Sequence, residues 1–138
     1  MILVDSNVLI DIVQDDPEWA DWSMDRLVAG ARDGVLAYNQ VIVAEVAPRF
    51  GSLEVFADFG RQLGLAYASL DEEAALGAGL AFAGYRRNRG TSSPSIPLPD
   101  FFIGGHAQAA GAAILTRDAR FYRSYFPQVE LITPETQP

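Results

Sequence analysis

MILVDSNVLID, residues 1–11, opens the chain with four apolar residues that end at Asp5. Ile2–Val4 is predicted to form a buried strand, because short continuous apolar runs are typical of strands that are covered on both faces. Asp5 follows this strand directly, and Asn7 comes two residues later. In open α/β sheets, ligands bind outside the carboxyl ends of the strands. This stretch therefore indicates an α/β fold and makes Asp5 a candidate site residue.

Short apolar runs alternate with longer segments of helical character along the rest of the chain. Further strands are predicted at residues 35–38, 65–68, 112–115 and 129–132, with helices at 17–32, 39–46, 52–63, 72–89, 100–111 and 119–126. Strands that alternate with helices favour a parallel sheet with helices on its faces. We therefore predict a three-layer α/β/α sandwich around a mostly parallel sheet of four to five strands, in a single domain covering residues 1–138.

Three local features set the predicted helix boundaries. Asn39 is expected to cap a helix that Pro48 interrupts or ends. Ser69–Glu72 fits a capping box at the start of the long helix. The segment 91–99 contains three prolines and is predicted to be an extended loop.

Composition limits the class of protein. The chain has 138 residues, no cysteine, 49% hydrophobic residues and a net charge of −8. Disulfides and thiolate metal sites are therefore excluded, and generic adhesion to nucleic acid through a basic surface is disfavoured. No apolar stretch reaches the roughly 20 residues that a membrane span needs, so we expect a cytoplasmic protein without membrane contact. The chain contains no lysine, which excludes a Walker-type nucleotide site.

Four acidic residues from distant parts of the chain are candidates for one site. Asp118 follows the strand predicted at 112–115, Asp100 begins a predicted helix after three prolines, and Glu45 lies within the apolar run QVIVAEVA. Each has a simpler interpretation: the three aspartates are good helix caps, and the glutamate could face solvent. Carboxylates gathered at one sheet edge repel one another unless a cation neutralises them. A site of oxygen ligands without Cys or His suits Mg²⁺ or Mn²⁺ and favours phosphate chemistry.

Four stretches together resemble the conserved segments of PIN-domain proteins, and more narrowly the VapC-type toxin ribonucleases. They are MILVDSNVLID, the glutamate in VAEVA, LPDFFIGGHAQAAG and AAILTRDARFYRSYFP, and they span nearly the whole chain in the order of the family. The long proline-rich segment before Asp100 is a departure from the family pattern.

The resemblance implies a Mg²⁺- or Mn²⁺-dependent endoribonuclease, the toxin of a type II toxin–antitoxin pair. By position, Asp5, Glu45, Asp100 and Asp118 are the catalytic and metal-binding residues, and Asn7 and Thr116 support them. The implied reaction is attack of metal-activated water on an RNA phosphodiester, which leaves 5′-phosphate and 3′-hydroxyl ends. The implied partners are RNA, a small antitoxin protein and a second copy of the chain in a homodimer.

The RNA-contact candidates are arginines in the second half of the chain, because guanidinium groups bind phosphate well. They are Arg86, Arg87, Arg89, Arg117 and Arg120. His106 is the only histidine and is expected to be structural or exposed, because it lacks the partners that catalysis needs. Two other functions remain open: a non-catalytic PIN-like module that binds RNA or protein, and a housekeeping PIN nuclease without an antitoxin.

Overall fold

The computed structural model describes residues 1–90 and 95–138. Five strands form one sheet: β1 (Ile2–Val4), β2 (Leu36–Tyr38), β3 (Ala66–Tyr67), β4 (Ala113–Leu115) and β5 (Leu131–Ile132). Their order across the sheet is β3-β2-β1-β4-β5, and every neighbouring pair is parallel. The predicted α/β class and parallel sheet are confirmed.

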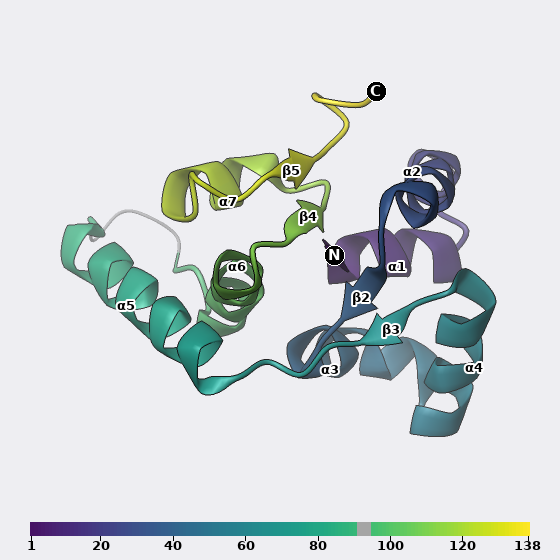
Figure 1. Cartoon of the computed structure of the whole chain (residues 1–138), viewed down its shortest axis with the longest axis horizontal. Coiled ribbons are helices and arrows are strands. Elements are labelled where there is room, and N and C mark those ends of the chain that lie inside the picture. The colour runs from purple at the N-terminus through teal and green to yellow at the C-terminus, as the bar shows by residue number, and fades with distance from the viewer. Residues whose placement is uncertain (91–94) are drawn as a thin grey trace.

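Helices cover both faces of this sheet. They are α1 (Ser6–Val13), α2 (Ala20–Asp33), α3 (Gln40–Phe50), α4 (Leu53–Leu63), α5 (Glu72–Asn88), α6 (Leu98–Ala110) and α7 (Ala119–Tyr125). Figure 1 shows α1, α2 and α4 on one side of the sheet, and α5, α6 and α7 on the other. In residues 1–90 and 95–138, no helix is long and apolar enough to cross a membrane.

The central strands are buried on both faces, which explains their continuous apolar runs. Leu3, Val4, Ile114 and Leu115 have no exposed surface. β1 pairs with β2 on one side and with β4 on the other, with Val4 opposite Leu115. The chain order thus reverses at β1, and the carboxyl ends of β1 and β4 lie side by side at the point where open α/β sheets bind ligands.

The structure corrects two predicted helix boundaries. Pro48 does not end its helix: α3 continues to Phe50, and Gly51 closes it in the left-handed conformation. The proline lies in the last turns, where it removes a single backbone hydrogen bond from the helix. The capping box at 69–72 is also wrong, because Asp71 caps α5 by accepting a hydrogen bond from the Ala74 amide at 2.9 Å.

The extended loop predicted at residues 91–99 ends before Leu98, where helix α6 begins. Residues 91–94 of this predicted loop lie outside the described residues. Helix α6 begins at Leu98, so Pro99 lies in its first turn, where a missing amide hydrogen has no helical partner to lose. Asp100 is therefore inside the helix and does not cap it. Pro97 occupies the cap position without a side-chain hydrogen bond.

Candidate active site at the acidic edge of the sheet

The first acid lies where strands β1 and β4 end together. The Asp5 amide donates a hydrogen bond to the Leu115 carbonyl at 2.9 Å, which continues the parallel ladder by one residue. Thr116 follows β4 directly and has no exposed surface. Its Oγ1 donates to Asp5 Oδ2 at 2.7 Å. The strand register thus places the residue after β1 against the residue after β4.

Asp5 accepts hydrogen bonds on both carboxylate oxygens. Oδ2 receives the Thr116 hydroxyl, the Tyr122 hydroxyl at 3.2 Å and Asn7 Nδ2 at 3.2 Å. Oδ1 receives the Ser6 amide at 2.8 Å, so Asp5 also caps α1. Burial raises the pKa of Asp5 above its usual value, and these hydrogen bonds partly offset that rise. The fold therefore holds this carboxyl group in a fixed orientation at a position that disfavours its charge.

Ser6 connects the first acid to Glu45. Its Oγ lies 3.1 Å from Glu45 Oε1 and 3.3 Å from Asp5 Oδ1, so one hydroxyl bridges α1 and α3. Glu45 is half-buried, and this burial raises the pKa of its carboxyl group. The hydrogen bond from Ser6 lowers the pKa, whereas the negative charges of Asp5 and Asp100 raise it further. Glu45 therefore faces the acidic edge and not bulk solvent.

Asp100 and Asp118 complete the acidic edge. Burial raises the pKa of Asp100, and the charges of Asp5 and Asp118 raise it further. Asp118 is exposed; its Oδ1 accepts the Phe121 amide at 3.3 Å as the cap of α7, and its own amide donates to Thr116 Oγ1 at 2.9 Å. Asp118 and Asp5 are therefore helix caps, as the simpler interpretation expected, and both also belong to the acidic group at the sheet edge.

Tyr122 reports on the same electrostatic environment. Burial raises the pKa of its hydroxyl well above the usual 10.0, and the negative charges of Asp5, Asp100 and Glu45 contribute to this rise. Acids from four separate segments of the chain therefore act on one another across the carboxyl edge of the sheet.

The donor chemistry of these residues fits a hard divalent cation. Within the described part of the chain, no group of three or more acidic, histidine or cysteine side chains is placed so that it could hold a metal ion as a cage. Mg²⁺ does not need such a cage, because it is usually held by one or two carboxylates and keeps several waters. A divalent cation at Asp5, Glu45 and Asp100 would relieve the repulsion that raises the pKa values of these three groups.

Sequence reasoning missed two residues that contact the acids, Ser6 and Tyr122, and also Asp11, a buried acid that pairs with Arg117. Tyr122 lies four positions after Asp118, and helical periodicity places such residues on one face. Asp11 is 2% exposed within the apolar run VLIDIV, the same signal that identified Glu45. At both Asp11 and Glu45, an acid inside an apolar run has a polar partner in the folded protein.

The arginines expected to contact RNA differ in their environment. Arg117 forms an ion pair with Asp11 at 2.7 Å and lies 5.1 Å from the centre of the Trp19 ring. Arg86 lies over the Phe82 ring at 5.9 Å. Arg89 and Arg120 line a cavity next to Asp118, whereas Arg87 is exposed on α5. Arg117 is thus engaged within the protein and is a weaker candidate for RNA contact than the others.

His106 and Asn39 form a buried polar pair. His106 is 5% exposed, and its Nδ1 lies 3.0 Å from Asn39 Nδ2. The Asn39 Oδ1 accepts the Ile42 amide and so caps α3. These contacts explain the one histidine of the chain as a structural residue.

Fold and site together define a class of protein: a parallel α/β domain with carboxylates at the point where the strand order reverses. The PIN domain family model matches residues 2–127, and the chain belongs to this family. Among curated proteins, none matches the chain.

Solved structures share the fold. VapBC2 from Rickettsia felis bound to a promoter DNA fragment has a TM-score of 0.73 at 19% identity, and the match covers 96% of this chain and 98% of that one. DNA-bound VapBC from Salmonella typhimurium has a TM-score of 0.69 at 20% identity, covering 96% of each chain. FitAcB from Neisseria gonorrhoeae has a TM-score of 0.60 at 20% identity, covering 98% of this chain and 99% of that one. At these low identities the similarity shows a shared fold alone.

Proposed function

We propose that this protein is a Mg²⁺- or Mn²⁺-dependent endoribonuclease that acts as the toxin of a type II toxin–antitoxin pair. Membership of the PIN domain family supports nucleic-acid hydrolysis. The observation that carries the proposal is the electrostatic coupling at the sheet edge: Asp5, Glu45 and Asp100 each have a raised pKa, and the last two are raised partly by neighbouring acids.

A structural role alone does not explain these acids. A fold gains nothing from holding several half-buried carboxylates against one another, since each raised pKa is a cost to stability at neutral pH. Sites where charge is disfavoured in this way are often functional sites. A bound Mg²⁺ or Mn²⁺ would neutralise a phosphodiester and lower the pKa of a bound water.

We assign each side chain a role in this reaction. Asp5 and Asp100 bind the cation directly, and Glu45 and Asp118 bind it directly or through water. Thr116, Asn7 and Tyr122 hold Asp5 Oδ2 by hydrogen bonds, so that this carboxylate does not rotate when a cation binds. Such fixed orientation by supporting hydrogen bonds is common around metal ligands.

The toxin assignment rests on the solved structures of the same fold. Three of them are described as VapBC or FitAcB assemblies, and one more is a toxin–antitoxin complex from Klebsiella pneumoniae with a TM-score of 0.64 at 18% identity. We therefore propose a small antitoxin protein as partner. A homodimer as the working form is proposed on the family resemblance alone.

Cleavage of structured RNA in Mn²⁺ tests the enzymatic proposal. The purified protein should cut RNA, and Asp100→Ala should reduce the rate by at least about a hundredfold, because removal of one metal ligand or charge-stabilising group commonly has that effect. Asp58→Ala is the matched control, since this acid is exposed on α4 and pairs with Arg61 at 2.9 Å. Equal activity of wild type and Asp100→Ala would mean that a contaminating nuclease cuts the RNA.

Expression in a bacterial host separates the toxin from a housekeeping nuclease or a binding module. The toxin proposal predicts growth arrest by wild type, none by Asp100→Ala, and relief by co-expression of the small protein from the neighbouring gene. Harmless expression of an active enzyme would leave a housekeeping nuclease. Absence of cleavage in Mn²⁺ and in Mg²⁺ would leave a binding module.

A further inference from the structure

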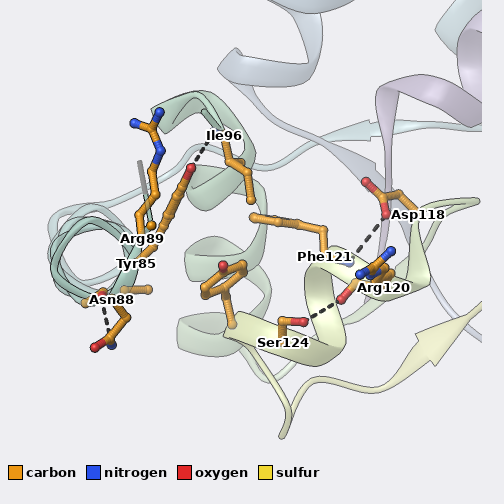
Figure 2. Close-up of a pocket in the computed structure, with 12 residues that line it drawn as sticks. Tyr85, Asn88, Arg89, Ile96, Asp118, Arg120, Phe121 and Ser124 are labelled. Carbon is orange, nitrogen blue, oxygen red and sulfur yellow. Dashed lines mark hydrogen bonds between the residues drawn. The ribbon is translucent and has the colours of Figure 1, made fainter. Parts of the chain in front are cut away.

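A groove adjoins the acidic edge between helices α5 and α7. Its volume is about 720 Å³, within the roughly 300–1,000 Å³ of pockets that bind small molecules. Asp118 is part of its wall, and Figure 2 shows this acid beside Arg120, where helix α7 begins. The groove therefore shares one wall residue, Asp118, with the proposed active site, and its size is sufficient for a nucleotide.

The lining combines a hydrophobic surface with arginines. Ile96, Phe121 and Tyr125 supply apolar area. Arg89, directly after α5, and Arg120, on α7, lie on opposite sides of the groove (Figure 2). Tyr85 stacks on one face of the Tyr125 ring at 5.6 Å with an interplanar angle of 21°, so a base can contact only the partly exposed remainder of this ring. Aromatic faces that accept a base beside cations that accept phosphate are the arrangement found in grooves for single-stranded nucleic acid.

Charge favours an anionic ligand. The chain carries a net charge of −8, yet the described residues that line this groove include two arginines and one acid, Asp118. Within residues 1–90 and 95–138, no carboxylate lies within ion-pair distance of the exposed Arg120 guanidinium. The other α7 arginine, Arg123, pairs with Glu135 at 2.6 Å and does not line the groove.

We infer that this groove binds a nucleotide of single-stranded RNA next to the phosphate that is cut, with its base against Tyr125 and its phosphate at Arg120. Base-paired RNA does not fit this role, because its bases are stacked on one another and cannot lie on a side chain. Asn88 and Ser124 also line the groove, but Asn88 Nδ2 donates to the Gly84 carbonyl and Ser124 Oγ donates to the Arg120 carbonyl, both at 3.0 Å, so only their oxygen atoms can accept from a base edge. The inference rests on the proposed nuclease function and names the form of its substrate.

Binding without turnover tests the inference separately from cleavage. All variants are made in an Asp100→Asn background, and the affinity for a short fluorescent single-stranded RNA is measured by anisotropy in Mg²⁺ over a range of salt concentrations. Arg120→Gln should weaken binding about fivefold or more and reduce the salt dependence by about one phosphate contact. Arg123→Gln removes an arginine from the same helix outside the groove and should leave the affinity within about twofold.

Tyr125→Leu tests the base contact. It should weaken binding at least about fivefold, because stacking of one base on an aromatic ring has an effect of this size. Its thermal unfolding is checked first, because Tyr125 also packs on Phe101 at 5.2 Å. Arg120→Glu, at an exposed position, provides a second variant that does not disturb the core and should abolish binding. A duplex of the same sequence should compete poorly.

Three results would overturn the inference. Arg120→Gln and Arg120→Glu could bind single-stranded RNA as tightly as the background protein. Arg123→Gln could weaken binding as much as Arg120→Gln, which would indicate diffuse attraction to helix α7. The groove variants could keep their RNA affinity but lose a co-expressed small protein, which would make the groove a protein-docking surface. Absence of cleavage by the wild-type protein would instead contradict the proposed function.

Discussion

Arg117 and Asp11 form a two-point ion pair: Nε lies 2.7 Å from Oδ2, and Nη2 lies 2.8 Å from Oδ1. Asp11 is 2% exposed and also accepts the Ser23 hydroxyl at 2.9 Å. The Arg117 amide donates to Asn7 Oδ1 at 3.2 Å. This one residue, between Thr116 and Asp118 in the chain, thus attaches the loop after β4 to helix α1.

Arg117→Gln is expected to destabilise the protein by about 2–4 kcal/mol, because it leaves the buried Asp11 carboxylate without its cation. Unfolding in urea measures this change. The double variant Asp11→Asn/Arg117→Gln should recover part of the loss, since no unpaired charge then remains. Arg123→Gln is the control: its pair with Glu135 is exposed, so the loss should be below about 1 kcal/mol. Equal effects of both single variants would contradict a structural role for the Arg117 pair.

Asp100→Asn is expected to raise the free energy of unfolding in EDTA by a few tenths to about 1 kcal/mol. The neutral amide removes the repulsion from Asp5 and Asp118, and solvent around this half-buried side chain limits the gain. Added Mg²⁺ should stabilise wild type more than the variant. Thermal unfolding with and without Mg²⁺ measures both effects, with Asp58→Asn as an exposed control. A variant that is less stable than wild type in EDTA would contradict the repulsion.

The same raised pKa values predict a pH dependence of stability without metal. A carboxyl group whose pKa is higher in the folded protein binds more protons when folded, so it favours folding at low pH. For Asp5, Glu45 and Asp100, this contribution is fully present below the pKa values of the unfolded chain, which are near 3.8 for the aspartates and 4.5 for the glutamate. It is lost as the pH rises through the higher pKa values of the folded protein.

The difference between wild type and Asp100→Asn isolates the part that belongs to one acid. In EDTA, the advantage of the variant should be largest at pH 8 and should vanish as the pH falls through the folded pKa of Asp100. Stabilisation of the wild-type protein by Mg²⁺ should also decrease as the pH falls, because protonated carboxyl groups do not bind the cation. Melting temperatures of both proteins from pH 4 to pH 8 measure this. A pH-independent difference would rule out titration of Asp100 as its cause.

The fold followed from the sequence because its signals are local. Each central strand is covered on both faces, so each one appears as an uninterrupted apolar run with helical segments between. The strand at Ile2–Val4 and the acid after it were both predicted, and the order of the remaining strands places Thr116 beside that acid. The position of the acidic edge therefore depends on backbone topology.

The side-chain contacts within the site were harder to predict from the sequence. Ser6 and Tyr122 reach Asp5 through side-chain rotamers and helix packing, which periodicity does not determine. The cap of α5 was misplaced by two residues because Ser69 and Asp71 both fit a cap, and the position of the chain after β3 decides between them. Local propensity allows several residues to cap a helix, and tertiary packing determines which of them does so.

Close packing of helices α5 and α6 gives a last prediction. A Cβ added at Gly105 would lie 2.7 Å from the Ala74 carbonyl oxygen and 2.8 Å from the Ala78 amide nitrogen, both of which are backbone atoms of α5. Because backbone cannot move aside as a flexible side chain does, Gly105→Ala should destabilise the protein by at least about 1–3 kcal/mol.

Gly79→Ala on α5 is the matched control for this substitution. Nothing lies within 4 Å of an added Cβ there, and alanine is the better helix former, so the variant should gain about 0.5–1 kcal/mol. Urea unfolding of both proteins measures the difference. Because α6 carries Asp100, Gly105→Ala should also reduce RNA cleavage by moving α6 against α5, whereas Gly79→Ala should cleave at the wild-type rate. A Gly105→Ala protein as stable as Gly79→Ala would mean that α5 and α6 are separated more widely than the structure places them.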